Sequence, residues 1–367
     1  MTRLGASRAG VVLLLTSGLA CAPRPAAAPR ASTSLAAEVD SARKIARALV
    51  DAQRVPGFAV TVSIGESVVW RQGFGSADLS VKRPATPETQ FRIGSVSKII
   101  TATLLMRLVE ERRVELDAPI GRYLSLPPHL AGTTLRQLAG HLAGVRHYRG
   151  NEFLGMAHFS SPREALSIFA GDSLIAAPGS RYSYSSYGYN LIGAVLESAT
   201  STPYVDLVER EVLVPLGMTK TVVDVDGAPP DRAHTYAVGT DGMISDAPHD
   251  DLSGRWPSGG FISSTDDLVR LGSSVLGPGL LNARSLVTMT TPQRLTSGAP
   301  TSVGIGWRVS VDSSGRRYLH HGGTSNGGAA FLLVYPEQRL VVAMASNAFT
   351  PWGERDALAI ASVFLRR

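Results

Sequence analysis

The chain has 367 residues, 44% of them hydrophobic and 18% charged, which describes an ordinary globular protein long enough to bury a sizeable core. Its formal net charge is +6, but residues 1–30 contain four arginines (Arg3, Arg8, Arg24 and Arg30) and no acid, so the remainder carries 6 − 4 = +2. The sequence has no cluster of Lys and Arg interleaved with aromatic residues, which excludes a nucleic-acid partner.

The N-terminus has the pattern of an export signal. Two arginines precede an apolar run from Ala9 to Leu15, and small residues lead to the only cysteine, Cys21, so no disulfide can form within the chain. We expect residues 1–21 to be a signal peptide and residues 22–36 to be a Pro/Ala-rich tether. Two alternatives stay open: Cys21 is lipidated and anchors the chain to a membrane, or cleavage occurs further on, near residues 25–28. Both predict export from a bacterial cytoplasm, to the periplasm or beyond.

Strand patterns occur near both ends of the remaining chain. Residues 37–52 have helical periodicity, and residues 58–64 and 67–70 form a predicted hairpin. The middle of the chain is mostly helical, and four further strands are predicted at 306–309, 317–321, 329–335 and 340–346, before a closing helix over 353–365.

This order predicts an α/β fold. One antiparallel sheet is built from both termini (residues 37–92 and 300–367) and flanked by helices, and an all-helical domain (residues 93–299) is inserted between its halves. No other apolar run is long enough to span a bilayer.

Ser95 and Lys98 stand at the head of an apolar run, residues 99–109, that is typical of a buried helix. Residues three apart share a helix face, so both side chains are expected to point into one cleft. A serine hydroxyl needs an adjacent base to act as a nucleophile, and a lysine can serve if burial lowers its pKa. The pair therefore predicts nucleophilic catalysis.

A second candidate group lies in a tyrosine-rich loop, residues 178–193, that leads into a helix. A tyrosine beside a lysine ammonium would have a lowered pKa and could carry a proton between a serine and a leaving group. Four tyrosines occur there, and we interpret Tyr182, Tyr187 and Tyr189 as packing residues. Tyr184 remains as the candidate proton shuttle.

The third group is a strand that runs into a glycine-rich segment, residues 319–328. Glycines let a backbone come close to a ligand, so this strand edge could supply a backbone N–H to an oxyanion. His320 and His321 are adjacent, but on a strand they face opposite sides, and no third ligand lies nearby in sequence. We therefore expect no metal site.

Three motifs occur in this order: Ser95-Val96-Ser97-Lys98, Tyr184-Ser185-Ser186 and His321-Gly322-Gly323. The set resembles the serine β-lactamase-like superfamily, which includes class C β-lactamases, D,D-peptidases and related esterases. The resemblance covers roughly residue 37 to the C-terminus. Segment 141–148 is similar to the branch of mitochondrial serine β-lactamase-like proteins. Further matching segments are 116–120, 214–218 and 258–264.

The resemblance implies a role for each motif residue. Ser95 would be the acylated nucleophile, Lys98 its activating partner and Tyr184 the general base. The backbone N–H groups of Ser95 and Thr324 would form the oxyanion hole. His321 would stand where class C β-lactamases have a lysine that helps to orient the tyrosine and the substrate.

Two residues depart from the family pattern. Ser186 replaces the usual asparagine beside the tyrosine and, like Gly323, is an expected substrate contact with fewer hydrogen bonds to offer. A histidine at 321 is about half charged near pH 6.5, so it is no fixed cation for a substrate carboxylate. The motif can also be read one residue earlier, with His320 in the site.

These features predict an exported serine hydrolase that forms an acyl-enzyme on Ser95 and acts as an esterase or peptidase. Its partner would be a small-molecule or peptide acyl substrate, and no metal or organic cofactor is implied. One alternative is a β-lactamase or D,D-peptidase. Another is a catalytically idle binding or assembly protein with the same fold.

Overall fold

The computed structural model describes residue 5 and residues 35–225 and 229–366. Apart from residue 5, the expected signal segment with Cys21 lies outside the described residues, and so does most of the expected tether. Within the described part, no helix combines the length and apolar character needed to cross a membrane.

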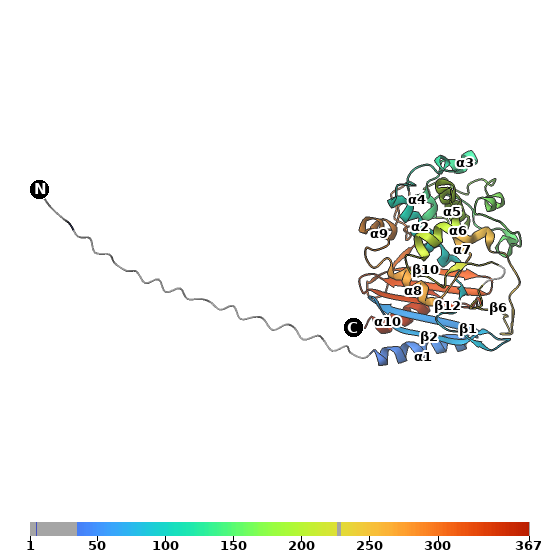
Figure 1. Cartoon of the computed structure of the whole chain (residues 1–367), viewed down its shortest axis with the longest axis vertical. Coiled ribbons are helices and arrows are strands. Elements are labelled where there is room, and N and C mark those ends of the chain that lie inside the picture. The colour runs from blue at the N-terminus through green and yellow to red at the C-terminus, as the bar shows by residue number, and fades with distance from the viewer. Residues whose placement is uncertain (1–4, 6–34, 226–228, 367) are drawn as a thin grey trace. The chain divides into compact units, whose positions relative to one another are not determined.

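The larger sheet has seven antiparallel strands in the order β3-β2-β1-β12-β11-β10-β9 (Figure 1). The strands are β1 Gly57–Ile64, β2 Ser67–Asp78, β3 Arg83–Pro84, β9 Arg308–Val311, β10 Arg317–Ser325, β11 Gly328–Tyr335 and β12 Leu340–Ser346. Because β1 pairs with β12 in the centre, with Val60 opposite Met344, the two ends of the folded chain complete one sheet. This confirms the predicted fold class.

Helices cover both faces of this sheet (Figure 1), which explains why β1, β11 and β12 are almost continuously apolar. On one face, α1 (Ala36–Gln53) and α10 (Glu354–Phe364) pack on side chains such as Val60 and Val62. The opposite face packs against α8 (Thr265–Ser273) and the helical region.

The region between the two halves of the sheet contains the remaining elements. Its helices are α2 Ser97–Glu110, α3 Pro128–Ala131, α4 Leu135–Ala139, α5 Ser186–Thr200, α6 Tyr204–Val208, α7 Trp256–Gly259 and α9 Ala283–Thr290, with short 3₁₀ turns and one π turn. Helix α2 is buried almost all round, as its sequence predicts.

The expectation that the insertion is all-helical is wrong in detail. Short strands β4 Phe91–Arg92, β8 Phe261–Ser263 and β5 Val222–Val223 form a three-stranded sheet, and β6 Tyr236–Val238 pairs with β7 Ile244–Asp246. Strands of two or three residues are too short to show a periodicity, so they could not be read from the sequence.

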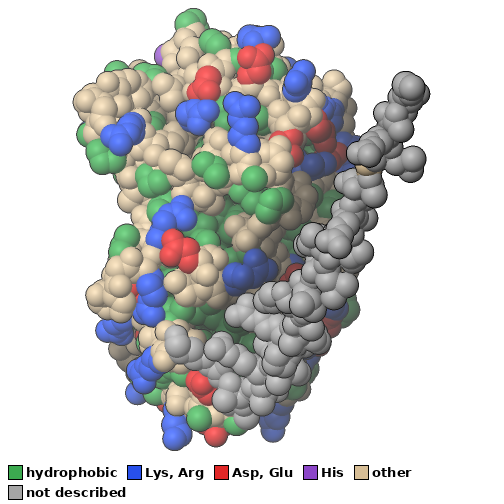
Figure 2. All heavy atoms as spheres, turned by 90° about the vertical axis from the view of Figure 1, so that its left-hand side faces the viewer, with side chains coloured by type: hydrophobic (Ala, Val, Ile, Leu, Met, Phe, Trp, Pro, Cys, Tyr) green, Lys and Arg blue, Asp and Glu red, His purple; other side chains and the backbone are tan. Residues whose placement is uncertain are grey.

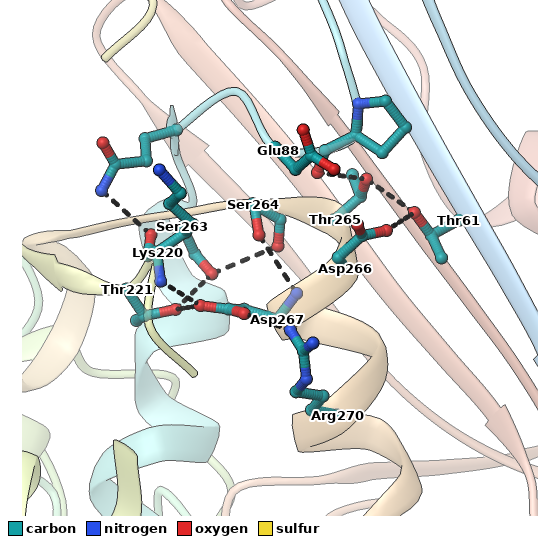
Figure 3. A network of polar contacts seen from close by, with 12 residues as sticks. Thr61, Glu88, Lys220, Thr221, Ser263, Ser264, Thr265, Asp266, Asp267 and Arg270 are labelled. Carbon is teal, nitrogen blue, oxygen red and sulfur yellow. Dashed lines mark hydrogen bonds and ion pairs between the residues drawn. The ribbon is translucent and has the colours of Figure 1, made fainter. Parts of the chain in front are cut away.

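A polar network ties the segment β8–α8 to its surroundings (Figure 3). The buried carboxylate of Asp267 accepts hydrogen bonds from the backbone N–H of Lys220 at 2.7 Å and from the Thr221 hydroxyl at 2.9 Å. Thr61 of β1 contacts Thr265 at 2.9 Å. These contacts hold β8 and α8 in place. Residues 258–260, directly before β8, border the site described below.

On the face drawn in Figure 2, basic and acidic side chains are interspersed among apolar and uncharged ones.

Candidate active site

Ser95 lies in a tight 3₁₀ turn, Gly94–Val96, directly before α2. Gly94 has a φ of +47°, and a Cβ there would lie 2.6 Å from the backbone nitrogen of Thr324. A side chain at this position would therefore be strained and would also collide with β10. Gly94 therefore lets β10 run close beside Ser95. This is the position that the glycine-rich segment 319–328 predicts for the strand.

Lys98 is fully buried one turn after Ser95. Its Nζ lies 3.1 Å from Ser95 Oγ, 3.0 Å from Ser186 Oγ and 2.7 Å from the carbonyl oxygen of Ser258. Burial lowers the pKa of Lys98 from 10.5 to about 7, and the positive charge of Arg308 adds to the effect. Lys98 is thus buried beside Ser95, with the lowered pKa that the sequence predicts for a buried lysine there.

The Tyr184 hydroxyl donates a hydrogen bond to Ser95 Oγ over 2.8 Å. The ring is enclosed by His141, whose centroid lies 4.4 Å away, and by Lys98 Nζ at 5.0 Å. Burial raises the pKa of Tyr184 above 10 even though Arg308 opposes this. The expectation that the neighbouring lysine lowers this pKa is therefore wrong, because desolvation of the phenolate outweighs the attraction of nearby cations.

Two histidines hold the start of α5, which directly follows Tyr184. The backbone N–H of Ser185 donates to His141 Nδ1 and that of Ser186 to His147 Nδ1, each over 3.2 Å. The first N–H groups of a helix lack partners within it, so these rings cap α5. In the sequence, both histidines stand out only as part of the family resemblance. This capping role is not visible there, because each histidine is about 40 residues from its partner.

His320 and His321 face opposite sides of β10, as predicted. His321 lies beside the site: its ring centroid is 6.4 Å from that of Tyr184, and its Nδ1 is 2.7 Å from the Gly322 carbonyl oxygen. His320 packs on the other side against Phe331, with Nε2 3.0 Å from Ser310 Oγ. The structure therefore contradicts the alternative in which His320 lies in the site.

The expectation that His321 is about half charged near pH 6.5 is wrong. Burial, together with the positive charge of Lys98, lowers the pKa of His321 to about 3. The side chain is therefore neutral throughout the physiological range, rather than half charged near pH 6.5.

These groups surround a cavity of about 260 Å³. It is lined by Ser95, His147, Tyr148, Phe153, Tyr184, Ser186, Arg255, Ser258, Gly259, Gly322, Thr324 and Ser325. Of the predicted site residues, Ser95, Tyr184, Ser186 and Thr324 line it directly, whereas Lys98 is buried behind Ser95. Gly323 is absent from the lining, but its backbone lies against the Ser95 turn.

Two arginines of the site were not predicted. Arg255 lines the cavity and pairs with the buried carboxylate of Asp250, which also binds Arg92 at 2.6 Å. Arg308, in β9, lies over the Tyr184 ring, 5.6 Å from its centroid, and forms no ion pair with any acid among the described residues. Neither lies in a local motif, so only the folded chain shows their proximity.

Hydrogen-bond capacity indicates how Lys98 and Ser95 can exchange a proton. As an ammonium, Lys98 has three N–H groups and three acceptors around it. Loss of one proton leaves a lone pair, and because the Ser258 carbonyl can only accept, that lone pair faces a hydroxyl, Ser95 or Ser186. Neutral Lys98 can therefore take the proton of Ser95.

Among residues 5, 35–225 and 229–366, no three His, Cys, Asp or Glu side chains gather as metal ligands. The fold and the serine–lysine–tyrosine cluster together define a serine hydrolase of the β-lactamase and penicillin-binding-protein type. The chain belongs to the Beta-lactamase family, whose model matches residues 42–364. The family resemblance inferred from the three motifs is thus confirmed.

Relatives of this chain carry the names of different activities. The human mitochondrial serine beta-lactamase-like protein LACTB is 26% identical over 85% of this chain and 74% of its own length. A D-aminopeptidase of Gluconobacter oxydans is 28% identical over 80% of this chain and 56% of its own. The structure of a D-amino acid amidase from Ochrobactrum anthropi SV3 is similar with a TM-score of 0.78 at 22% identity, covering 90% of this chain and 99% of that one. At this identity, the structural likeness shows the fold alone.

Proposed function

We propose that the protein hydrolyses ester or amide bonds through a covalent acyl-enzyme on Ser95. The observation that carries the proposal is the position of Ser95 Oγ, which lies within hydrogen-bond distance of both Lys98 Nζ and the Tyr184 hydroxyl at one wall of a cavity. A nucleophile, a base of lowered pKa and a second proton carrier in one cluster are the requirements for acyl transfer.

In the proposed acylation step, neutral Lys98 acts as the base in place of Tyr184, because burial raises the pKa of Tyr184 and keeps it protonated. Lys98 removes the Ser95 proton while Oγ attacks the carbonyl carbon. The backbone N–H groups of Ser95 and Thr324 bind the oxyanion that forms. Tyr184 then gives its proton to the leaving group and is reprotonated by Lys98, so that the leaving group departs neutral. Water attacks the acyl-enzyme by the reverse transfers, which releases the acid and restores Ser95.

Simple esters and peptides fit the site better than β-lactams. The Ser186 hydroxyl accepts a hydrogen bond from Lys98 and has only one proton to donate to a substrate, and His321 is neutral. The two groups that would replace the family's substrate-amide and carboxylate contacts are therefore weak ones. One missing charge-assisted hydrogen bond costs about 1.5–3 kcal/mol, or roughly one to two powers of ten in rate.

One observation favours a second candidate, a peptidase for substrates with a free carboxylate. Arg308 lies over Tyr184 without an acidic partner among the described residues, and it could bind such a group. Arg308→Met would then lower kcat/KM for a D-Ala-D-Ala peptide more than for its C-terminal amide. Equal losses on the two would reject this candidate.

A fluorophosphonate probe and a substrate panel test the main proposal. The wild type should be labelled at Ser95 and should hydrolyse short-chain p-nitrophenyl esters, with weak turnover of nitrocefin, whereas Ser95→Ala should do neither and remain cooperatively folded. Labelling of another serine would overturn the assignment. An unlabelled, inactive wild type would favour the idle binding protein. Nitrocefin turnover equal to that of dedicated β-lactamases would make β-lactams the main substrates.

We further propose that the protein is exported, on the basis of the pattern in residues 1–21, and that it works in the periplasm or attached to a membrane through Cys21.

A further inference from the structure

The ring of His147 is held on several sides at the wall of the cavity. Its Nδ1 accepts the backbone N–H of Ser186 over 3.2 Å. One face packs on the Tyr148 ring, with centroids 4.4 Å apart, and the ring stands nearly perpendicular to Tyr184 at 5.4 Å. These contacts fix the ring orientation, so its second nitrogen, Nε2, has a defined direction.

The protonation of that ring follows from its partner. A backbone N–H can only donate, so Nδ1 carries no proton and the neutral ring has its proton on Nε2. Although His147 as a residue is exposed at the cavity, desolvation of the ring and the charge of Lys98 lower its pKa to about 4. At neutral pH, His147 is therefore a hydrogen-bond donor and no base.

This donor has no partner in the described part of the chain. His147 lines the cavity together with Ser95 and Tyr184, and its Nε2 forms no hydrogen bond with any described residue. The neighbouring Ser186 hydroxyl accepts a hydrogen bond from Lys98 Nζ over 3.0 Å, which leaves its own proton to donate. The Nε2–H of His147 is therefore an oriented donor at the cavity that is free to bind a ligand.

We propose that His147 contacts the substrate, donating its Nε2–H to a second carbonyl oxygen in the acyl part. The matching substrate class is an ester or amide whose acyl group carries an amide, as in N-acylated amino acids and peptides. Only the acyl part stays in the cavity through both steps, so a contact there serves acylation and deacylation alike. The inference rests on the proposed acyl-enzyme function and specifies its substrate.

Two p-nitrophenyl esters of similar size separate this role from a structural one. The N-acetylglycine ester has the second carbonyl and the butyrate ester does not. In the full-length protein, His147→Ala should lower the ratio of kcat/KM for the first ester to that for the second by about 3- to 10-fold, the value of one neutral hydrogen bond. Loss of the cap on α5 would reduce both rates together and leave the ratio unchanged.

His147→Gln is the conservative variant, because its amide can accept from Ser186 and also donate, and it should preserve the wild-type ratio. His158→Ala is the matched control: His158 is exposed, pairs with Asp251 at 2.9 Å and lies outside the cavity. A ratio unaffected by His147→Ala would overturn the inference while leaving the proposed function intact. Failure of the wild type to turn over either ester, without labelling of Ser95, would overturn both.

Discussion

Gly323 of β10 lies so close to Ile93 that a Cβ at residue 323 would be 1.9 Å from the Ile93 carbonyl oxygen. The strand is therefore in direct contact with the turn that carries Ser95, and this contact sets the distance between the nucleophile and the backbone N–H of Thr324.

Gly323→Ala should separate the two segments and impair acylation. A displacement of about 1 Å at a reacting centre can cost on the order of 10²-fold in rate. We expect a loss of that size in kcat/KM for p-nitrophenyl butyrate, with a folded protein by circular dichroism. Gly277→Ala is the control, since nothing lies within 4 Å of its added Cβ. Wild-type rates in Gly323→Ala would show that this strand does not form the oxyanion hole.

Lys98 and Tyr184 should behave as one proton-transfer unit, because both contact the same atom of Ser95. Lys98→Ala and Tyr184→Phe should each lower turnover by about 10²–10⁴-fold. The double variant should lose little more than the worse single one, as is usual for residues that act together. Strictly additive losses would assign them separate roles.

The pH dependence of hydrolysis should report Lys98. Its neutral form is the active one, and its pKa is about 7, so kcat/KM for an uncharged ester should rise with pH and reach half its maximum near pH 7. His321, with a pKa of about 3, should add no inflection between pH 5 and 8, even for substrates that carry a carboxylate. A rise in kcat/KM with its midpoint near pH 10 would contradict the lowered pKa of Lys98.

The same lysine should make stability depend on pH. Folding lowers the pKa of Lys98 from 10.5 to about 7, so between these values the unfolded chain binds more protons and the free energy of unfolding rises with pH. Each pKa unit is worth about 1.4 kcal/mol, so the gain from pH 7 to 9 is at most roughly 2–3 kcal/mol. Urea denaturation should show that Lys98→Met removes this gain.

Lys44→Met, at an exposed position of α1, should leave the gain intact. An unchanged pH dependence in Lys98→Met would mean that other groups account for it.

The proposed attachment of the exported protein to a membrane can be tested at Cys21. If the cysteine is lipidated, the wild-type protein should sediment with membranes, and Cys21→Ala should release it, because an acyl anchor supplies the membrane affinity. Mass spectrometry of the N-terminus gives an independent readout. A soluble wild type that begins after residue 26 would show simple cleavage instead.

The sequence alone determined what depends on local spacing. Strand alternation and apolar runs specified the sheet strands and the buried helix after Ser95, because side-chain periodicity reflects which face is buried. Ser95 in the 3₁₀ turn and Lys98 in the first turn of α2 are only three residues apart, so their contact needed no tertiary information. The placement of His321 rather than His320 toward the site was expected from the motif, although the sequence left both readings open.

Tertiary structure decided the contacts and pKa values that depend on distant residues. Tyr184 reaches Ser95 across 89 positions, and Arg308 and the Ser258 carbonyl join from other segments. The sequence could not show how far burial lowers the pKa of Lys98, to about 7. Nor could it show that burial keeps Tyr184 protonated and His321 uncharged. Each pKa depends on how completely the whole fold excludes water from one group, and no local pattern encodes that.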